Sequence, residues 1–110
     1  MKPNATGKAE LMTPEGEIQA YLKKRVEALG GQFRKMEWTG RRGAPDCLIW
    51  WTGPFFAFVE IKAPNGRLST LQTRELERMA AAGFMVAVIW SKEDADELVF
   101  ILTQPVGCVQ

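Results

Sequence analysis

Two apolar segments joined by a short turn constrain the fold of this 110-residue chain more than any other feature. Residues 46–51 (DCLIWW) and 55–62 (FFAFVEIK) are rich in aromatic and branched side chains, which favour β-strands. The intervening residues 52–54 (TGP) are typical of a turn. We therefore expect a hairpin in which Asp46 lies opposite Glu60, with their side chains roughly 5 Å apart.

The same register places Leu48 opposite Phe58, and it makes both faces of the hairpin apolar. Such strands are typical of a sheet that is covered on both sides, and charged groups at its end are costly unless they are matched. The face of the two acids carries Leu48, Trp50, Phe56 and Phe58, and the other face carries Cys47, Ile49, Trp51, Phe55 and Val59.

Side-chain alternation places Lys62 on the same face as Glu60, one step further along the strand. Two facing carboxylates destabilise a strand pair unless a cation compensates them, and their oxygen atoms suit Mg²⁺ or Mn²⁺. The three groups together predict a site for phosphodiester hydrolysis. The alternative is structural: Glu60 and Lys62 form an ordinary ion pair at a strand end, and Asp46 satisfies a turn.

Composition narrows the class of protein. Fourteen basic and thirteen acidic residues leave a net charge of +1, so attraction to nucleic acid has to come from local patches. The absence of histidine and of a CxxC pair excludes histidine-based mechanisms and zinc sites, and Cys47 reads as core filler. We expect a cytoplasmic protein with no membrane span and no organic cofactor.

The order of elements predicts an α/β fold, α-β-β-β-α-β-α, in which helices flank a central mixed sheet. We expect a flexible arm over residues 1–12 and one domain over residues 13–110. Its expected elements are a helix capped by Thr13 and closed by Gly30-Gly31, a strand over 32–38, the hairpin, a helix over 69–82, a strand over 84–90 parallel to a neighbour, and a last helix from Ser91 whose part 98–102 fits a strand equally well.

Several polar residues outside the hairpin are candidates for the same site. Glu17 lies near the buried stripe of the first helix, although it also reads as a solvated acid of the first turn. Gln72 lies on the core-facing stripe of the 69–82 helix, although it also completes a capping box with Ser69. Arginines of two loops suit phosphate contact or a plain soluble surface, and four further cations extend a basic surface if they converge. The loop arginines are Arg41, Arg42 and Arg67, and the further cations are Lys23, Lys24, Arg34 and Lys35.

Taken in order, these residues resemble the PD-(D/E)XK nuclease superfamily and, within it, the VRR-NUC family. The resemblance covers about residues 14–102 and rests on an early helix glutamate, the Gly43-Ala44-Pro45-Asp46 loop, the Glu60-Ile61-Lys62 strand and the S-x-x-Q start of the next helix. It implies a restriction-endonuclease-like core. It also implies that Glu17, Asp46, Glu60 and the Ile61 carbonyl hold the metal, that Lys62 is the catalytic lysine and that Gln72 supports the site.

The resemblance further implies a Mg²⁺- or Mn²⁺-dependent DNA endonuclease that acts as a homodimer on branched DNA such as four-way (Holliday) junctions. Cutting two strands symmetrically needs two active sites, which favours a two-fold dimer. Two alternatives stay open at this point: a restriction-type or nicking nuclease, and a catalytically silent DNA-binding module that keeps the fold.

Overall fold

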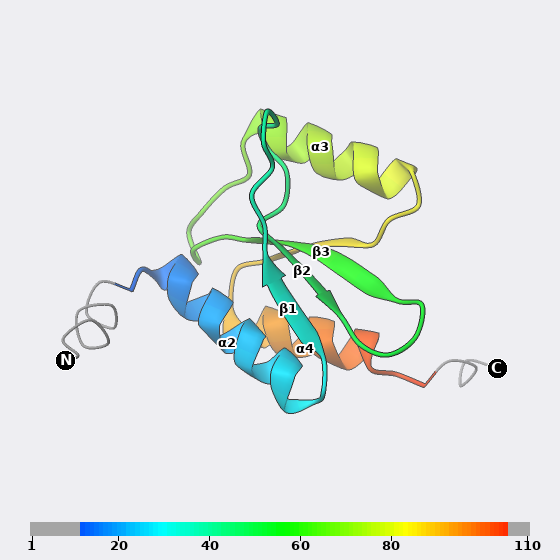
Figure 1. Cartoon of the computed structure of the whole chain (residues 1–110). Coiled ribbons are helices and arrows are strands. Elements are labelled where there is room, and N and C mark those ends of the chain that lie inside the picture. The colour runs from blue at the N-terminus through cyan, green and yellow to red at the C-terminus, as the bar shows by residue number, and fades with distance from the viewer. Residues whose placement is uncertain (1–11, 106–110) are drawn as a thin grey trace.

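The computed structural model describes residues 12–105, and they form a four-stranded sheet with helices on both of its faces (Figure 1). The arm expected over residues 1–12 lies, except for Met12, outside the described residues, and so does Cys108. The elements are α2 (Pro14–Ala28), β1 (Gln32–Lys35), β2 (Cys47–Trp50), β3 (Phe56–Ile61), α3 (Thr70–Ala81), β4 (Val86–Ile89) and α4 (Lys92–Leu102).

The sheet has the order β1-β2-β3-β4, with antiparallel pairing except between the parallel strands β3 and β4. In the β2–β3 pair, Leu48 lies opposite Phe58 and Trp50 opposite Phe56. The predicted hairpin register and the mixed sheet are therefore confirmed. The same register brings Asp46, just before β2, to the end of the sheet at which Glu60 lies.

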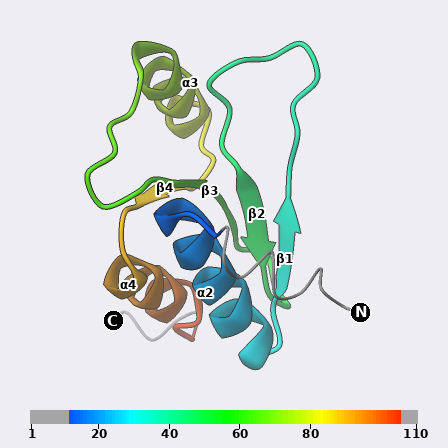
Figure 2. The same cartoon turned by 90° about the vertical axis from the view of Figure 1, so that its left-hand side faces the viewer.

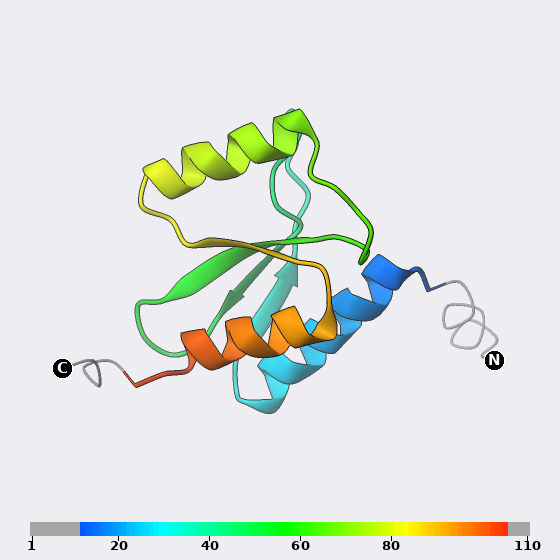
Figure 3. The same cartoon turned by 180° about the vertical axis from the view of Figure 1, so that it is seen from behind.

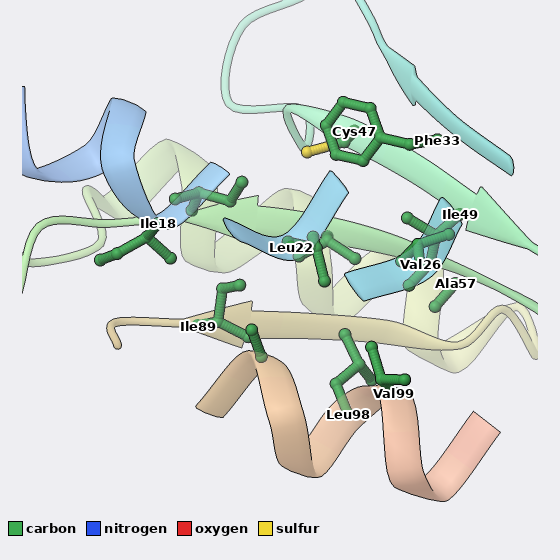
Figure 4. Close-up of a cluster of buried hydrophobic side chains, with 13 residues drawn as sticks. Ile18, Leu22, Val26, Phe33, Cys47, Ile49, Ala57, Ile89, Leu98 and Val99 are labelled. Atoms are coloured by element: carbon green, nitrogen blue, oxygen red, sulfur yellow. The ribbon is translucent and has the colours of Figure 1, made fainter. Parts of the chain in front are cut away.

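Helices α2 and α4 cover one face of the sheet, and α3 lies over the other (Figures 1 and 2). The α2 and α4 side holds the main hydrophobic core, because every second residue of β2 and β3 points there and meets an apolar helix stripe (Figure 4). Cys47 is fully buried within it, as expected of core filler. The core residues are Ile18, Leu22, Val26, Phe33, Cys47, Ile49, Ala57, Val59, Ile61, Ile89, Ala95, Leu98 and Val99.

Cover on the α3 side is only partial, which corrects the expectation of a sheet buried on both faces. Phe56 is 38% exposed and Phe84 is 45% exposed. A hollow of about 410 Å³ lies over the part of the hairpin that α3 does not reach, and we call its apolar lining the aromatic face. The aromatic face consists of Leu48, Trp50, Phe55, Phe56 and Phe58. Phe55 was expected on the opposite face; it lies next to the turn and lines both this hollow and another beside Trp51.

Most element boundaries lie within two residues of the predicted ones, one differs by three residues, and one alternative that the sequence left open is decided. The strand expected over 32–38 ends at Lys35, because the chain then leaves the sheet as a loop that extends to α3 (Figure 2). Residues 98–102 belong to α4, because Leu98 and Val99 bury the apolar stripe of a helix. Between residues 12 and 105, no helix has the length and apolar character that a membrane span requires.

The packing predicts which leucines matter for stability. Leu22 on α2 is fully buried, whereas Leu71 on α3 is 48% exposed. We expect Leu22→Ala to lower the free energy of unfolding by about 2–5 kcal/mol, because it leaves a cavity in the core. Leu71→Ala is the matched control, with an expected change of under about 0.5 kcal/mol. Urea denaturation followed by circular dichroism measures both, and equal losses would contradict this description of the core.

Candidate active site

Asp46 is held at the end of the sheet by bonds on both of its sides. Its backbone oxygen accepts a hydrogen bond from Met36 N at 2.7 Å, which continues the pairing of the first two strands beyond β1. Its side-chain Oδ2 accepts from the backbone N–H of Ile61 at 3.0 Å. The preceding Pro45 is fully buried, and its carbonyl accepts from Trp38 Nε1 at 2.9 Å. The carboxylate is thus tied to the strand that carries Glu60.

Glu60 is a buried carboxylate, only 2% exposed, near the end of β3. Its Oε2 accepts a hydrogen bond from Gln72 Nε2 at 2.9 Å and lies 3.8 Å from Lys62 Nζ. Its other oxygen, Oε1, is buried and has no hydrogen-bond partner among the described residues. Leaving a buried carboxylate oxygen without a partner is unfavourable, so this atom marks the place where the site lacks a positive charge or a donor.

Burial raises the pKa of Glu60 from its ordinary 4.5 to about 7, and the negative charge of Asp46 adds to the rise. The nearby Lys62 ammonium opposes it, and Glu15 contributes a smaller increase. The influence of Asp46 on Glu60 indicates that the two acids interact across the strand pair. A carboxyl group that titrates near neutrality in a partly enclosed site is typical of functional positions.

Gln72 caps helix α3 and also contacts Glu60. The side-chain Oε1 of Gln72 accepts a hydrogen bond from the Ser69 backbone N–H at 2.8 Å. The backbone N–H of Gln72 donates to Ser69 Oγ at 3.1 Å, and the two bonds form a capping box at the start of α3. Its Nε2 donates to Glu60 at the same time. The capping box therefore orients the amide so that its donor faces the buried acid.

Helix α2 brings Glu15, rather than Glu17, to the side of Asp46. Glu15 and Asp46 line a common hollow of about 190 Å³, and Glu15 Oε2 accepts from Ala63 N at 3.4 Å. Glu17 lines a different hollow, beside Pro64 and α4. The start of α2 lies next to the segment after β3 in both Figure 1 and Figure 3.

The periodicity of α2 contains the signal that could have selected Glu15. Ile18 and Leu22 are the first buried residues of the helix. Glu15 lies three residues before Ile18 and seven before Leu22, which puts it on the same face of the helix. Glu17 is offset from that stripe by one residue. The phase of the buried stripe thus places Glu15, and not Glu17, on the side of the helix that faces Asp46.

The loop before Asp46 packs closely on α3. Gly43 has a φ of 80°, and a Cβ at this position would lie only 2.7 Å from the Leu71 carbonyl oxygen. Arg41 donates from Nη2 to Glu75 Oε1 at 2.6 Å, and hydrogen bonds from Arg41 and then Arg78 lower the pKa of Glu75. The loop that positions Asp46 and the helix that positions Gln72 are thus docked on each other.

The predicted basic residues lie on several elements and have different partners. Arg42 and Arg67 are exposed on loops, whereas Arg41 pairs with Glu75 on α3. Arg34 lies over the Trp50 ring at 5.0 Å from its centroid. The remaining predicted cations lie on α2 and at the end of β1: Lys23, which pairs with Glu27, together with Lys24 and Lys35.

The donor set fits a hard divalent cation of the kind expected from the sequence. No group of three metal-ligating acids, histidines or cysteines occurs within residues 12–105. Two interacting carboxylates are nevertheless present, and Glu60 Oε1 has no hydrogen-bond partner in that part of the chain. Mg²⁺ binds proteins through one or two carboxylates and keeps several waters, so a pair of acids is sufficient for it.

Comparisons with known proteins agree on one family. The sequence profile of the VRR-NUC domain matches residues 7–93. A phage protein named "Putative nuclease p44", from Acyrthosiphon pisum secondary endosymbiont phage 1, is 37% identical over 79 residues, which cover 72% of this chain and 85% of the phage protein. A solved structure described as a VRR_NUC domain superposes with a TM-score of 0.75 at 42% identity, over 80% of this chain and 96% of that one.

The raised pKa of Glu60 predicts how stability depends on pH in metal-free protein. In the folded state the Glu60 carboxyl group keeps its proton up to about pH 7, whereas in the unfolded chain it loses the proton near pH 4.5. The stabilisation is therefore complete below about pH 4.5 and is lost as the pH rises through about 7. Urea denaturation in chelator should give an unfolding free energy that falls by on the order of 1–3 kcal/mol from about pH 5 to about pH 8.

Glu60→Gln is the control for this pH dependence. Its amide is similar in shape but does not titrate, so the free energy of unfolding of the variant should change much less over the same range. A decrease in Glu60→Gln as large as in the unaltered protein would assign the pH dependence to other groups.

Proposed function

The chain belongs to the VRR-NUC family, and from this premise we propose that it is a Mg²⁺- or Mn²⁺-dependent endonuclease that hydrolyses DNA phosphodiesters. The family match over residues 7–93 and the phage relative named as a nuclease support the general class. The observation that carries the proposal for this chain is the buried Glu60 beside Asp46, because one of its carboxylate oxygens has no hydrogen-bond partner among residues 12–105.

In the proposed site, Asp46, Glu60 and the backbone carbonyl of Ile61 hold the metal. Asp46 is already oriented by the Ile61 N–H, and Glu60 by Gln72, so few side chains have to reorganise. Glu15 lines one hollow with Asp46, whereas Glu17 lines a different one, and we propose Glu15, in preference to Glu17, as the acid contributed by α2. When bound, the divalent ion would polarise the phosphate and make a water more acidic.

Lys62 supplies the positive charge that this chain itself brings to the reaction. Its Nζ lies 3.8 Å from Glu60 Oε2, and its side chain is only 15% exposed. An ammonium in this position can stabilise the negative charge that develops on the phosphoryl oxygens, or exchange a proton with the attacking water. Gln72 keeps the Glu60 carboxylate in place during the reaction and does not itself exchange a proton.

Branched DNA, such as a four-way junction, is the proposed substrate, and a two-fold dimer is the proposed active form. Each chain carries one site, and cutting two strands symmetrically requires two. The aromatic face supports the dimer, because it leaves large apolar side chains uncovered on the α3 side of the sheet. Clusters of this kind, rich in Trp and Phe, are typical of protein interfaces. We propose that the two copies meet through this face.

The proposed roles of the site residues predict how much each substitution lowers the cleavage rate. Asp46→Asn, Glu60→Gln and Lys62→Ala should each lower the cleavage rate by at least about 10²-fold, because each removes a charge next to the reacting phosphate. Glu15→Gln should lower the rate more than Glu17→Gln does, since only Glu15 lines the hollow with Asp46. The assay is cleavage of end-labelled linear, flapped and four-way DNAs, with and without Mg²⁺ or Mn²⁺.

The same DNA substrates distinguish the proposed structure-selective nuclease from the two alternative functions. Preferential cutting of the four-way DNA supports structure selectivity, and efficient cutting of linear duplex at one sequence would indicate a restriction-type or nicking nuclease. Metal-independent binding without cleavage would identify a silent DNA-binding module. Any of the three catalytic variants that retains normal turnover while folded removes its residue from the mechanism.

The dimer proposal predicts that charged substitutions at two exposed phenylalanines affect self-association differently. Phe55 in the aromatic face is 54% exposed, and Phe100 on α4 is 65% exposed. Phe55→Glu should weaken self-association about tenfold or more, because a charge within an apolar contact is poorly tolerated. Phe100→Glu should leave it unchanged. Sedimentation equilibrium measures both, and a monomeric unaltered protein at all accessible concentrations would exclude the dimer.

A further inference from the structure

Within residues 12–105, Lys35 is the only cation that lines the hollow beside Asp46. The hollow has a volume of about 190 Å³, several times the roughly 30 Å³ that one water occupies in the liquid. Two carboxylates, those of Glu15 and Asp46, share it with the Lys35 ammonium. The full lining is Thr13, Glu15, Gly16, Gln19, Lys35, Asp46 and Ile61.

The sheet and α2 together set the position of Lys35. It ends β1 opposite Cys47, the residue after Asp46, so it lies at the same end of the sheet as the acids. Phe33, two residues earlier, is buried in the core on the α2 side, and alternation turns Lys35 toward the same helix. There its Nζ donates to Gln19 Oε1 at 3.2 Å. Gln19 lies one turn after Glu15 on α2, so one helix face presents both the acid and the amide.

Three other cations near the site have charged or aromatic partners, and Arg42 and Arg67 lie exposed on loops outside the lining of this hollow. Lys62 pairs with Glu60, Arg41 pairs with Glu75, and Arg34 lies over Trp50. Lys35 forms no ion pair within 4.0 Å with any carboxylate of the described part of the chain, and the one partner of its ammonium there is a neutral amide. Since a lysine ammonium has three donors, at least two of them remain available for an anion.

We propose that Lys35 contacts a backbone phosphate of the DNA at this site, on the side of the acids that faces α2. Gln19 positions the ammonium for this contact. The inference rests on the proposed nuclease function and extends it to how the substrate is held. Lys62 reaches the acids from the α3 side with Glu60 and Gln72, so the two lysines flank the acids from opposite faces of the sheet. The contacted phosphate is thus a neighbour of the one that is cut, and Lys35 is a positioning residue.

The test compares two exposed lysines in the full chain. Binding to a labelled four-way DNA in chelator, followed by anisotropy at several salt concentrations, counts the phosphate contacts, because log K falls with log salt in proportion to their number. Lys35→Gln should reduce the magnitude of this slope by about 1, whereas Lys35→Arg should keep it. Lys24→Gln, a change on the exposed surface of α2, is the matched control and should leave the slope unaltered.

Steady-state cleavage in Mg²⁺ gives an independent readout. Lys35→Gln should raise KM about tenfold and change kcat by less than about twofold, since it removes a contact made equally in the ground and transition states. An unchanged slope and KM in Lys35→Gln, or equal effects in Lys24→Gln, would overturn the inference. A fall in kcat at unchanged KM would overturn it too, because Lys35 would then act on the reacting phosphate. Failure of the unaltered protein to cut any DNA would instead refute the proposed function itself.

Discussion

The pairing of β2 with β3 in one register is the constraint on which the site depends. With Leu48 opposite Phe58, the alternating residues Cys47, Ile49 and Val59 enter the core under α2 and α4, and Glu60 turns to the α3 side. A slip of one residue would exchange the two faces, placing the carboxylate in the apolar core and the core residues under α3. The free energy that holds the register is therefore largely hydrophobic, although its functional result is the placement of an acid. The packing of the hydrophobic core thus determines where the Glu60 carboxylate lies.

Much of this arrangement could be predicted from the sequence, because the hairpin signal is local. Alternation and a three-residue turn were sufficient for the register, the face of Lys62 and the proximity of Asp46 to Glu60. Which acid of α2 lies beside Asp46 was harder to predict, since Glu15 and Glu17 are both acids of the first turn and only the phase relative to Ile18 separates them. The partial cover of the α3 face was not predictable, because apolar alternation does not reveal how far a helix extends over a sheet.

Long-range contacts between polar groups were the least accessible to sequence reasoning. Arg41 reads as a free loop arginine, yet it binds Glu75, a residue 34 positions away. Gln72 illustrates the opposite case, because it completes the predicted capping box and also contacts Glu60. Its side-chain carbonyl oxygen accepts a hydrogen bond from Ser69, and its amide nitrogen donates one to Glu60, so the capping residue also contacts the buried acid. A side chain with separate donor and acceptor atoms makes such a combination possible.

The docking of Gly43 on the first turn of α3 separates the integrity of the site from the integrity of the core. The loop that carries Asp46 and the turn that carries Gln72 touch each other, whereas the main core lies on the far side of the sheet under α2 and α4. Proteins open locally in cooperative units, with free energies well below that of global unfolding. Detachment of α3 would release Gln72 from Glu60 and the supporting surface from Asp46 in a single event, while the α2–α4 layer stayed folded. Activity can therefore be lost on warming before a spectroscopic melt of the whole domain begins.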